Sequence, residues 1–212
     1  IATGALTIAQ TNTVNALTTG VVTATISTTD IADLDDLTGT GNAYTITVGT
    51  ASVTAAALNT VNDATTVNIT ATAVTTITGT AAQLVTTYGG GIAGLGNELV
   101  TITDTTVSAS SLNTLDANTT GAINAATITT LTGTVAAVNT AYASSGITGL
   151  GNEAVTISDT TIDAALLITL DAFTSGLINA SSITTLTGSD ADKATVRASS
   201  GITGLPGSGG GG

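Results

Sequence analysis

Residues 101–155, TITDTTVSASSLNTLDANTTGAINAATITTLTGTVAAVNTAYASSGITGLGNEAV, decide the fold because the chain repeats them on both sides. Downstream, Thr156-Ile-Ser-Asp-Thr-Thr restarts the unit, and upstream Thr45-Ile-Thr-Val begins an earlier version, so that the period is about 55 residues. The closing motif GLGNE occurs at residues 94–98 and 149–153. Self-similarity at a fixed period is typical of solenoids and repeat arrays. The sequence therefore predicts a repeat protein.

Each unit divides into two similar halves, in which a helix-capping residue type precedes a short stretch rich in Ala and Leu. The capping residues are Thr54, Thr80, Ser108, Thr134, Asp163 and Ser189. Leu112 and Leu115 lie four and seven residues after Ser108, and this is helical spacing behind an N-cap. Val138 and Ala141 follow Thr134 in the same way. We expect a short helix in each half, ended by a left-handed glycine, with candidates Gly121, Gly146, Gly176 and Gly201.

The segments between these helices predict short strands, because β-branched residues alternate there, as in residues 100–104 and 127–132. The spacing of the caps Ser108, Thr134 and Asp163 predicts a coil of about 27 residues. The predicted fold is an α/β solenoid with short parallel strands and one short helix per coil. An all-β parallel helix, with the Ala/Leu stretches as loops, is the alternative.

A solenoid coil buries its apolar side chains against the same positions of neighbouring coils. The predicted core residues are Ile102, Leu112, Leu115, Ile123, Ile128, Leu131 and Val138. We interpret residues 45–205 as three repeats of about 55 residues forming one solenoid. Residues 1–44 form a degenerate N-terminal repeat, whose DIADLDDLTG segment (residues 30–39) predicts a short helix with solvated charges. Residues 206–212 are a flexible Gly/Ser linker by composition.

Composition excludes several functions. The chain has two basic and fourteen acidic residues, a net charge of −12, and no Cys, His, Met or Trp. Without His or Cys it has no catalytic triad, thiol nucleophile or structural zinc site. The negative charge opposes nucleic-acid binding, and no apolar run is long enough for membrane insertion. Because the carboxylates recur with the repeat, whereas a single active site would break it, we expect no enzyme.

The recurrent carboxylates suggest calcium as the one possible cofactor. Glu98 and Glu153 end the GLGNE turns, and Asp104 and Asp159 follow them at the same spacing. Carboxylate and turn carbonyl oxygens are the ligands that Ca²⁺ prefers. Against this, the nonapeptide repeat and the EF-hand loop are both absent. The alternative is that these residues only form turns and bond the backbone locally.

The Thr-x-Thr pattern is the second candidate feature. It occurs at residues 45/47, 76/78, 101/103, 130/132 and 185/187, and as Thr156/Ser158. Strand alternation places both hydroxyls on one face and the intervening residue on the other. Stacked coils would then present a flat threonine ladder of the kind found in ice-binding solenoids. The simpler interpretation is that Thr is a favoured polar residue on an exposed strand.

The pattern TTLTGTxAxVxTAYASSGITGLGNExVTIxDTTxxAxxLxTLDAxTxGxINA, which covers residues 45–205, resembles tandem repeats of very large cyanobacterial cell-surface and secreted proteins of adhesin- or haemolysin-like type. The resemblance implies an extracellular, cell-surface location and a structural or adhesive role. We therefore expect a spacer or self-assembly unit of an exported bacterial surface protein, with other copies or neighbouring repeats as partners through sheet edges and apolar ends. The alternative is a ligand-binding solenoid that uses the Thr-x-Thr ladder for ice or glycan.

Overall fold

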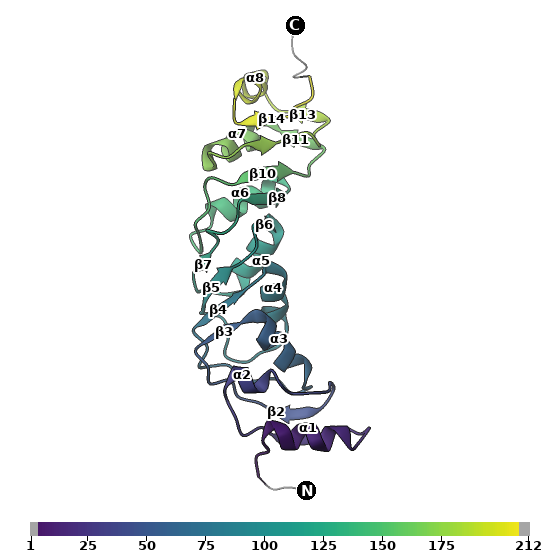
Figure 1. Cartoon of the computed structure of the whole chain (residues 1–212). Coiled ribbons are helices and arrows are strands. Elements are labelled where there is room, and N and C mark those ends of the chain that lie inside the picture. The colour runs from purple at the N-terminus through teal and green to yellow at the C-terminus, as the bar shows by residue number, and fades with distance from the viewer. Residues whose placement is uncertain (1–3, 208–212) are drawn as a thin grey trace. The chain divides into compact units, whose positions relative to one another are not determined.

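The computed structural model describes residues 4–207 as an α/β fold of short helices and parallel strands (Figure 1). Its helices are α1 (Ile8–Ala16), α2 (Ile31–Leu34), α3 (Ala55–Asp63), α4 (Ala81–Gly89), α5 (Ala109–Asn118), α6 (Val135–Ala143), α7 (Ala164–Phe173) and α8 (Asp190–Ala198). Its strands are β1 (Thr23–Thr25), β2 (Ala43–Thr45), β3 (Ser52–Thr54), β4 (Thr76–Gly79), β5 (Leu99–Ile102), β6 (Thr106–Ser108), β7 (Ile123–Asn124), β8 (Thr130–Gly133), β9 (Ile147–Thr148), β10 (Ala154–Ile157), β11 (Thr161–Asp163), β12 (Ile178–Asn179), β13 (Thr185–Thr187) and β14 (Ile202–Thr203).

The described residues divide into two compact units. Unit 1 comprises residues 4–101 and 118–122, and unit 2 comprises residues 102–117 and 123–207. In unit 1, β1 pairs with β2 and β3 pairs with β4, both in parallel. Helix α3 packs against α4 and α2, and Leu58, Ile77 and Leu84 are fully buried there. The apolar faces of α3 and α4 thus pack against β3 and β4.

Unit 2 contains a parallel sheet in the order β14-β12-β10-β8-β6. Strand β11 pairs with β13 and β7 pairs with β9, again in parallel. Helix α7 packs against α6 on one side and α8 on the other. All seven predicted core residues are buried, with 3% exposure or less. The alternating segments and the helical spacing therefore predict the core correctly, whereas the all-β alternative is wrong because the Ala/Leu stretches are helices.

Paired strands lie closer in sequence than the predicted coil length. Thr106 pairs with Thr130, and Thr130 in turn pairs with Ala154, whereas Val155 pairs with Ile178, one residue closer. The distance between the N-caps Ser108 and Thr134 overestimates the separation of paired strands. Ser108 pairs with Thr132, whereas the next N-cap, Thr134, lies two residues further along the chain. A whole repeat unit is seven residues longer than twice the separation of paired strands. These seven residues are the step from Ala154 in β10 to Thr161 in β11.

The predicted N-caps are correct. The side chains of Thr54, Thr80, Thr134, Asp163 and Ser189 each accept a hydrogen bond from a main-chain N–H in the first turn of their helix. Ser108 does the same for Ser111, at 3.1 Å. The predicted left-handed glycine ends are wrong, since Gly121, Gly146, Gly176 and Gly201 have no positive φ. Their role is steric.

The less regular ends agree with the expectations where they are described. Residues 30–39 contain the short helix α2, whose Asp33 is exposed, as are Asp35 and Asp36 after it. In the last half-unit, α8 buries only Val196. Pro206 and Gly207 form a turn, and the rest of the predicted 206–212 linker lies outside the described residues.

Candidate functional site

The GLGNE turn carries a buried carboxylate in each unit. Gly96 has φ of 138°, a backbone conformation that favours glycine, and its N–H points at the carboxylate of Glu98. The two carboxylate oxygens lie 3.0 and 2.9 Å from that nitrogen. Glu98 is only 1% exposed, and the Tyr88 hydroxyl donates to its Oε2 over 3.0 Å. A buried carboxylate therefore ties the end of α4 to the turn.

Unit 2 contains the same arrangement. Glu153 is 1% exposed, and its Oε2 accepts from the Gly151 N–H at 2.8 Å and from the Tyr142 hydroxyl at 2.9 Å. Glu153 Oε1, unlike either oxygen of Glu98, is buried without a hydrogen-bond partner. We call each arrangement a Tyr–Glu joint, built on Tyr88, Gly96, Glu98 and Gly121 in unit 1 and on Tyr142, Gly151, Glu153 and Gly176 in unit 2.

A glycine from the following half-repeat closes each joint. A Cβ on Gly121 would overlap the carbonyl oxygen of Glu98, and a Cβ on Gly176 would overlap that of Glu153. In unit 2 the buried Thr174 hydroxyl also donates to the Glu153 carbonyl over 3.1 Å. Glycine is required at both positions because two backbone segments approach each other closely there. The prediction that these glycines end helices is therefore wrong.

Burial raises the pKa of Tyr88 and of Tyr142 above the ordinary value for a phenol. The nearby hydroxyls of Thr119 and Thr174 oppose this pKa shift by hydrogen bonding, while Glu98 and Glu153 reinforce it. Neutral tyrosines suit the geometry, because each must donate its O–H proton to a carboxylate oxygen.

A second recurrent joint uses Asp116 and Asp171. The Ser144 hydroxyl donates to Asp116 over 2.8 Å and accepts from the Gly146 N–H. Ser199 does the same with Asp171, also at 2.8 Å, and with the Gly201 N–H. Each joint spans 28 residues of sequence and connects a helix to the loop that follows the next helix.

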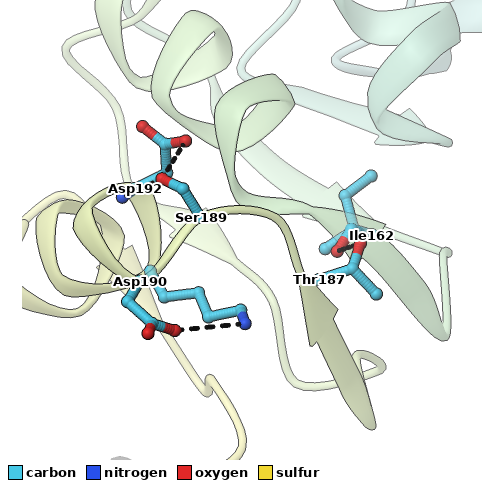
Figure 2. Close-up of polar contacts among 6 residues, drawn as sticks. Ile162, Thr187, Ser189, Asp190 and Asp192 are labelled. Carbon is cyan, nitrogen blue, oxygen red and sulfur yellow. Dashed lines mark hydrogen bonds and ion pairs between the residues drawn. The ribbon is translucent and has the colours of Figure 1, made fainter.

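Threonine hydroxyls bond the backbone of the preceding half-repeat throughout the described residues. Figure 2 shows one case, in which Thr187 donates to the carbonyl of Ile162 over 3.0 Å. Other threonine donors to a carbonyl 24 or 25 residues earlier are Thr66, Thr75, Thr120, Thr127, Thr129, Thr132, Thr148, Thr184 and Thr203. We call these bonds threonine staples. Part of the threonine excess therefore serves to hydrogen-bond one half-repeat to the preceding one, which composition alone did not indicate.

The helices are joined in a related way by asparagine side chains. Asn59 of α3 donates its amide to the carbonyl of Gln83 in α4 over 3.0 Å. Asn113 donates to Ala137 over 2.9 Å, and Asn139 donates to Leu166 over 3.2 Å. Each asparagine lies five residues after its N-cap, so this joint was visible as a repeated position in the sequence.

The four predicted calcium ligands occupy different environments. Glu98 and Glu153 are buried in the Tyr–Glu joints, and Asp159 accepts from the Val135 N–H at 2.7 Å, at the start of α6. Asp104 is half-buried. Within residues 4–207 no three Asp or Glu side chains gather closely enough to hold a metal ion. Calcium binding stays a prediction from the sequence.

The predicted Thr-x-Thr pairs do not stack in register in unit 2, because Thr130 and Thr132 pair with Ala154 and Thr156 and not with Thr156 and Ser158. One column of polar residues does form. Ser108, Thr132, Thr156, Asn179 and Thr203 are successive partners across the five-stranded sheet. Leu131 between the two hydroxyls of β8 is fully buried, as strand alternation requires. Thr132 and Thr203 donate their hydroxyl protons to backbone carbonyls of the same chain. These two hydroxyls therefore do not offer a free donor to a ligand.

A hollow of about 960 Å³ lies in unit 1 and is lined mainly by apolar residues such as Leu6, Val14, Val21 and Val22, without a titratable side chain. Among the described residues no helix has the length and apolarity needed to cross a membrane. Comparisons with family models, curated proteins and solved structures gave no match.

Proposed function

We propose that the chain is a structural or adhesive repeat module of an exported bacterial surface protein, acting as a spacer or self-assembly unit. One observation carries the proposal. The recurrent polar side chains bond the main chain or a side chain of an adjacent half-repeat, through the threonine staples, the asparagine amides and the two kinds of carboxylate joint. Such chemistry fixes one half-repeat to the next.

The proposed architecture is a solenoid of successive half-repeats. Parallel pairing at a nearly constant separation in sequence recurs within each unit, and it favours stacked coils whose stability is set between neighbours. The resemblance to cyanobacterial surface-protein repeats supports an extracellular location. This role requires no catalysis, and the high negative charge keeps such a module soluble.

The addition of one repeat unit tests the proposal. A second copy of residues 101–155 inserted in tandem should extend the fold, because a new unit buries its core against its neighbours. The denaturant m-value should rise roughly in proportion to the added buried surface. A chain with the same insert in scrambled order is the control and should leave the m-value unchanged. Equal m-values for the two chains would reject the spacer module.

Assembly and calcium are tested together by light scattering on the purified chain. Growth of particles with added Ca²⁺, dissolved by chelator, would support calcium-dependent assembly and make Glu98, Asp104, Glu153 and Asp159 the first mutants. Association without Ca²⁺ would support self-assembly alone. A strictly monomeric chain at high concentration would leave only the spacer role.

A ligand-binding face is the second candidate, favoured by the in-register column from Ser108 to Thr203. Ice or glycan would contact its methyl and hydroxyl groups. Replacement of the exposed Thr156 by Lys, with Thr169 on the surface of α7 as the matched control, should abolish any effect on ice growth. An unmodified chain that leaves ice growth unchanged would reject ice binding.

A further inference from the structure

The number of strands between successive helices changes within unit 2. Two strands, β7 and β8, lie between α5 and α6, and two strands, β12 and β13, lie between α7 and α8. Three strands, β9, β10 and β11, lie between α6 and α7. The additional strand lies where one repeat meets the next, at the seven-residue step from Ala154 in β10 to Thr161 in β11. The path between helices is therefore one strand longer at this junction.

The additional strand begins a new sheet. Strands β6 and β8 belong to a five-stranded sheet with β10, β12 and β14, whereas β11 pairs with β13 in a separate two-stranded sheet. In the sequence, β11 and β13 are the equivalents of β6 and β8, because each begins 55 residues after its counterpart. Equivalent strands of successive repeats thus lie in different sheets. This change of sheet is the reason that the Thr-x-Thr pairs do not stack in register.

The two sheets carry the same threonines. Thr106 of β6 pairs with Thr130 of β8, and Thr161 of β11 pairs with Thr185 of β13. Thr106, Thr161 and Thr185 are exposed, and Thr130 is half-buried. A pair of neighbouring threonine side chains is therefore present on each of the two sheets.

The hydrogen bonds inside the two sheets also correspond. Thr132 of β8 donates to the Val107 carbonyl of β6 over 3.4 Å. In the separate sheet, Thr187 of β13 donates to the Ile162 carbonyl of β11 over 3.0 Å (Figure 2). The third repeat thus rebuilds the strand pair of the second repeat with the same kind of bond, in a different sheet.

The row of helices continues across the junction without such a change. Asn113 of α5 bonds the Ala137 carbonyl of α6, and Asn139 of α6 bonds the Leu166 carbonyl of α7. Helix α7 packs against both α6 and α8. The helices therefore keep their neighbours, while the strands that carry equivalent threonines move from one sheet to the next.

We propose that successive repeats present the same strand surface on different sides of the solenoid, so that a row of repeats binds several separate partners around it. The inference rests on the proposed repeat-module function and specifies its partners as discrete molecules, each in contact with one repeat. A flat, extended partner such as ice fits less well. Its contact surface would not lengthen as repeats are added, because each new repeat begins a new sheet.

The test measures the distance between equivalent positions in the folded chain. The chain has no cysteine, so a pair of introduced cysteines carries two nitroxide labels at defined sites. One variant combines Thr106→Cys with Thr161→Cys, which are equivalent positions in different sheets. The control combines Thr106→Cys with Ala154→Cys, which are two strand separations apart in one sheet. Thr106, Ala154 and Thr161 are all exposed, and thermal unfolding checks that both variants are folded.

Dipolar electron paramagnetic resonance reads the two distances. The control pair should lie about 10 Å apart, which is two strand spacings. The equivalent pair should lie roughly 20 Å apart, because Thr161 follows Ala154 by seven residues of largely extended chain. If equivalent positions instead stacked in one column, Thr161 would also lie about 10 Å from Thr106, and that result would overturn the proposal.

A model partner tests whether the two sides admit separate molecules. The equivalent pair of cysteines carries biotin in place of the nitroxides, and a monomeric biotin-binding protein is added in excess. The mass of the complex, measured by light scattering, should correspond to two bound molecules per chain. One bound molecule per fully biotinylated chain would overturn the claim that equivalent surfaces serve separate partners.

These outcomes are distinguishable from failure of the repeat-module function itself. A short distance between positions 106 and 161, together with the larger m-value of the tandem chain, would reject only the change of side. Equal m-values for the tandem and scrambled chains would reject the module, whatever the distance.

Discussion

The Tyr–Glu joints of the two units are nearly identical, whereas the outer faces of α5 and α7 are not. The tyrosine-to-glutamate distance is 3.0 Å in one joint and 2.9 Å in the other, and both glutamates are 1% exposed. On the surface, Ser111 and Asn118 give way to Leu166 and Phe173. The repeat thus preserves the contacts between half-repeats and varies what faces outward. The joints that maintain the fold are therefore the conserved part of the repeat unit, and the exposed face of the helices is the variable part.

The largest expected effect comes from the glycines of the joints. Gly121→Ala and Gly176→Ala each drive a Cβ into a carbonyl oxygen, so each should destabilise the chain by about 3 kcal/mol. Urea unfolding measures this effect. Gly89→Ala is the control, because its Cβ meets nothing within 4 Å, and it should gain about 0.5 kcal/mol. Unequal costs at Gly121 and Gly176 would show that the two joints are not equivalent.

The tyrosine hydroxyls should expose the one difference between the joints. Tyr142→Phe keeps the stacking on Phe173 but leaves Glu153 with a single bond from Gly151, so we expect a loss of about 2 kcal/mol. Tyr88→Phe should cost about half as much, because Glu98 retains contacts from Gly96 to both oxygens. Urea unfolding of the two variants at neutral pH decides, and a larger loss for Tyr88→Phe would contradict this ranking.

Alkaline pH should weaken both joints. Burial raises the pKa of Tyr88 and Tyr142 in the folded chain above the unfolded value of 10.0. Their contribution is therefore complete below about pH 10 and falls as pH rises, because only the unfolded chain ionises there. The free energy of unfolding should decline as pH rises above about 10. The variant with both tyrosines replaced by Phe should decline less, and an equal slope would exclude these hydroxyls as the cause.

The smallest predicted effect is the loss of one threonine staple. Thr127 donates to the Ile102 carbonyl over 2.7 Å, so Thr127→Val should cost about 1 kcal/mol. Thr103→Val is the control, since Thr103 is exposed and makes no staple, and its change should lie within about 0.5 kcal/mol of zero. Equal effects at Thr127 and Thr103, measured by urea unfolding, would reject the stapling role.

The local features of the fold follow from the sequence because they depend on nearby residues. An N-cap such as Ser108 and the leucines that follow it lie within one helix, and the buried Leu131 lies within one alternating strand. The strand register did not follow, because the cap and the strand pairing are offset by two residues between Thr132 and Thr134. The spacing of caps measures where helices begin and says less about which residues pair.

The site was only partly visible in the sequence. Glu98 and Glu153 were singled out for recurring in the GLGNE turns, yet their partners Tyr88 and Tyr142 lie 10 and 11 residues upstream, and only their recurrence in each unit signalled a role. Gly121 looked like a helix end because its neighbour, the Glu98 carbonyl, belongs to the preceding half-repeat. The direction of a threonine hydroxyl depends on which carbonyl lies beside it, and composition cannot supply that.

The length added by one repeat tests the central claim, that half-repeats stack in parallel, most directly. Small-angle X-ray scattering on the chain with a tandem copy of residues 101–155 measures the maximum dimension. Because one added unit spans slightly more than two strand spacings of about 4.8 Å each, the account predicts an increase of roughly 11 Å. An unchanged maximum dimension, or an increase of about 25 Å typical of a separate compact domain, would contradict it.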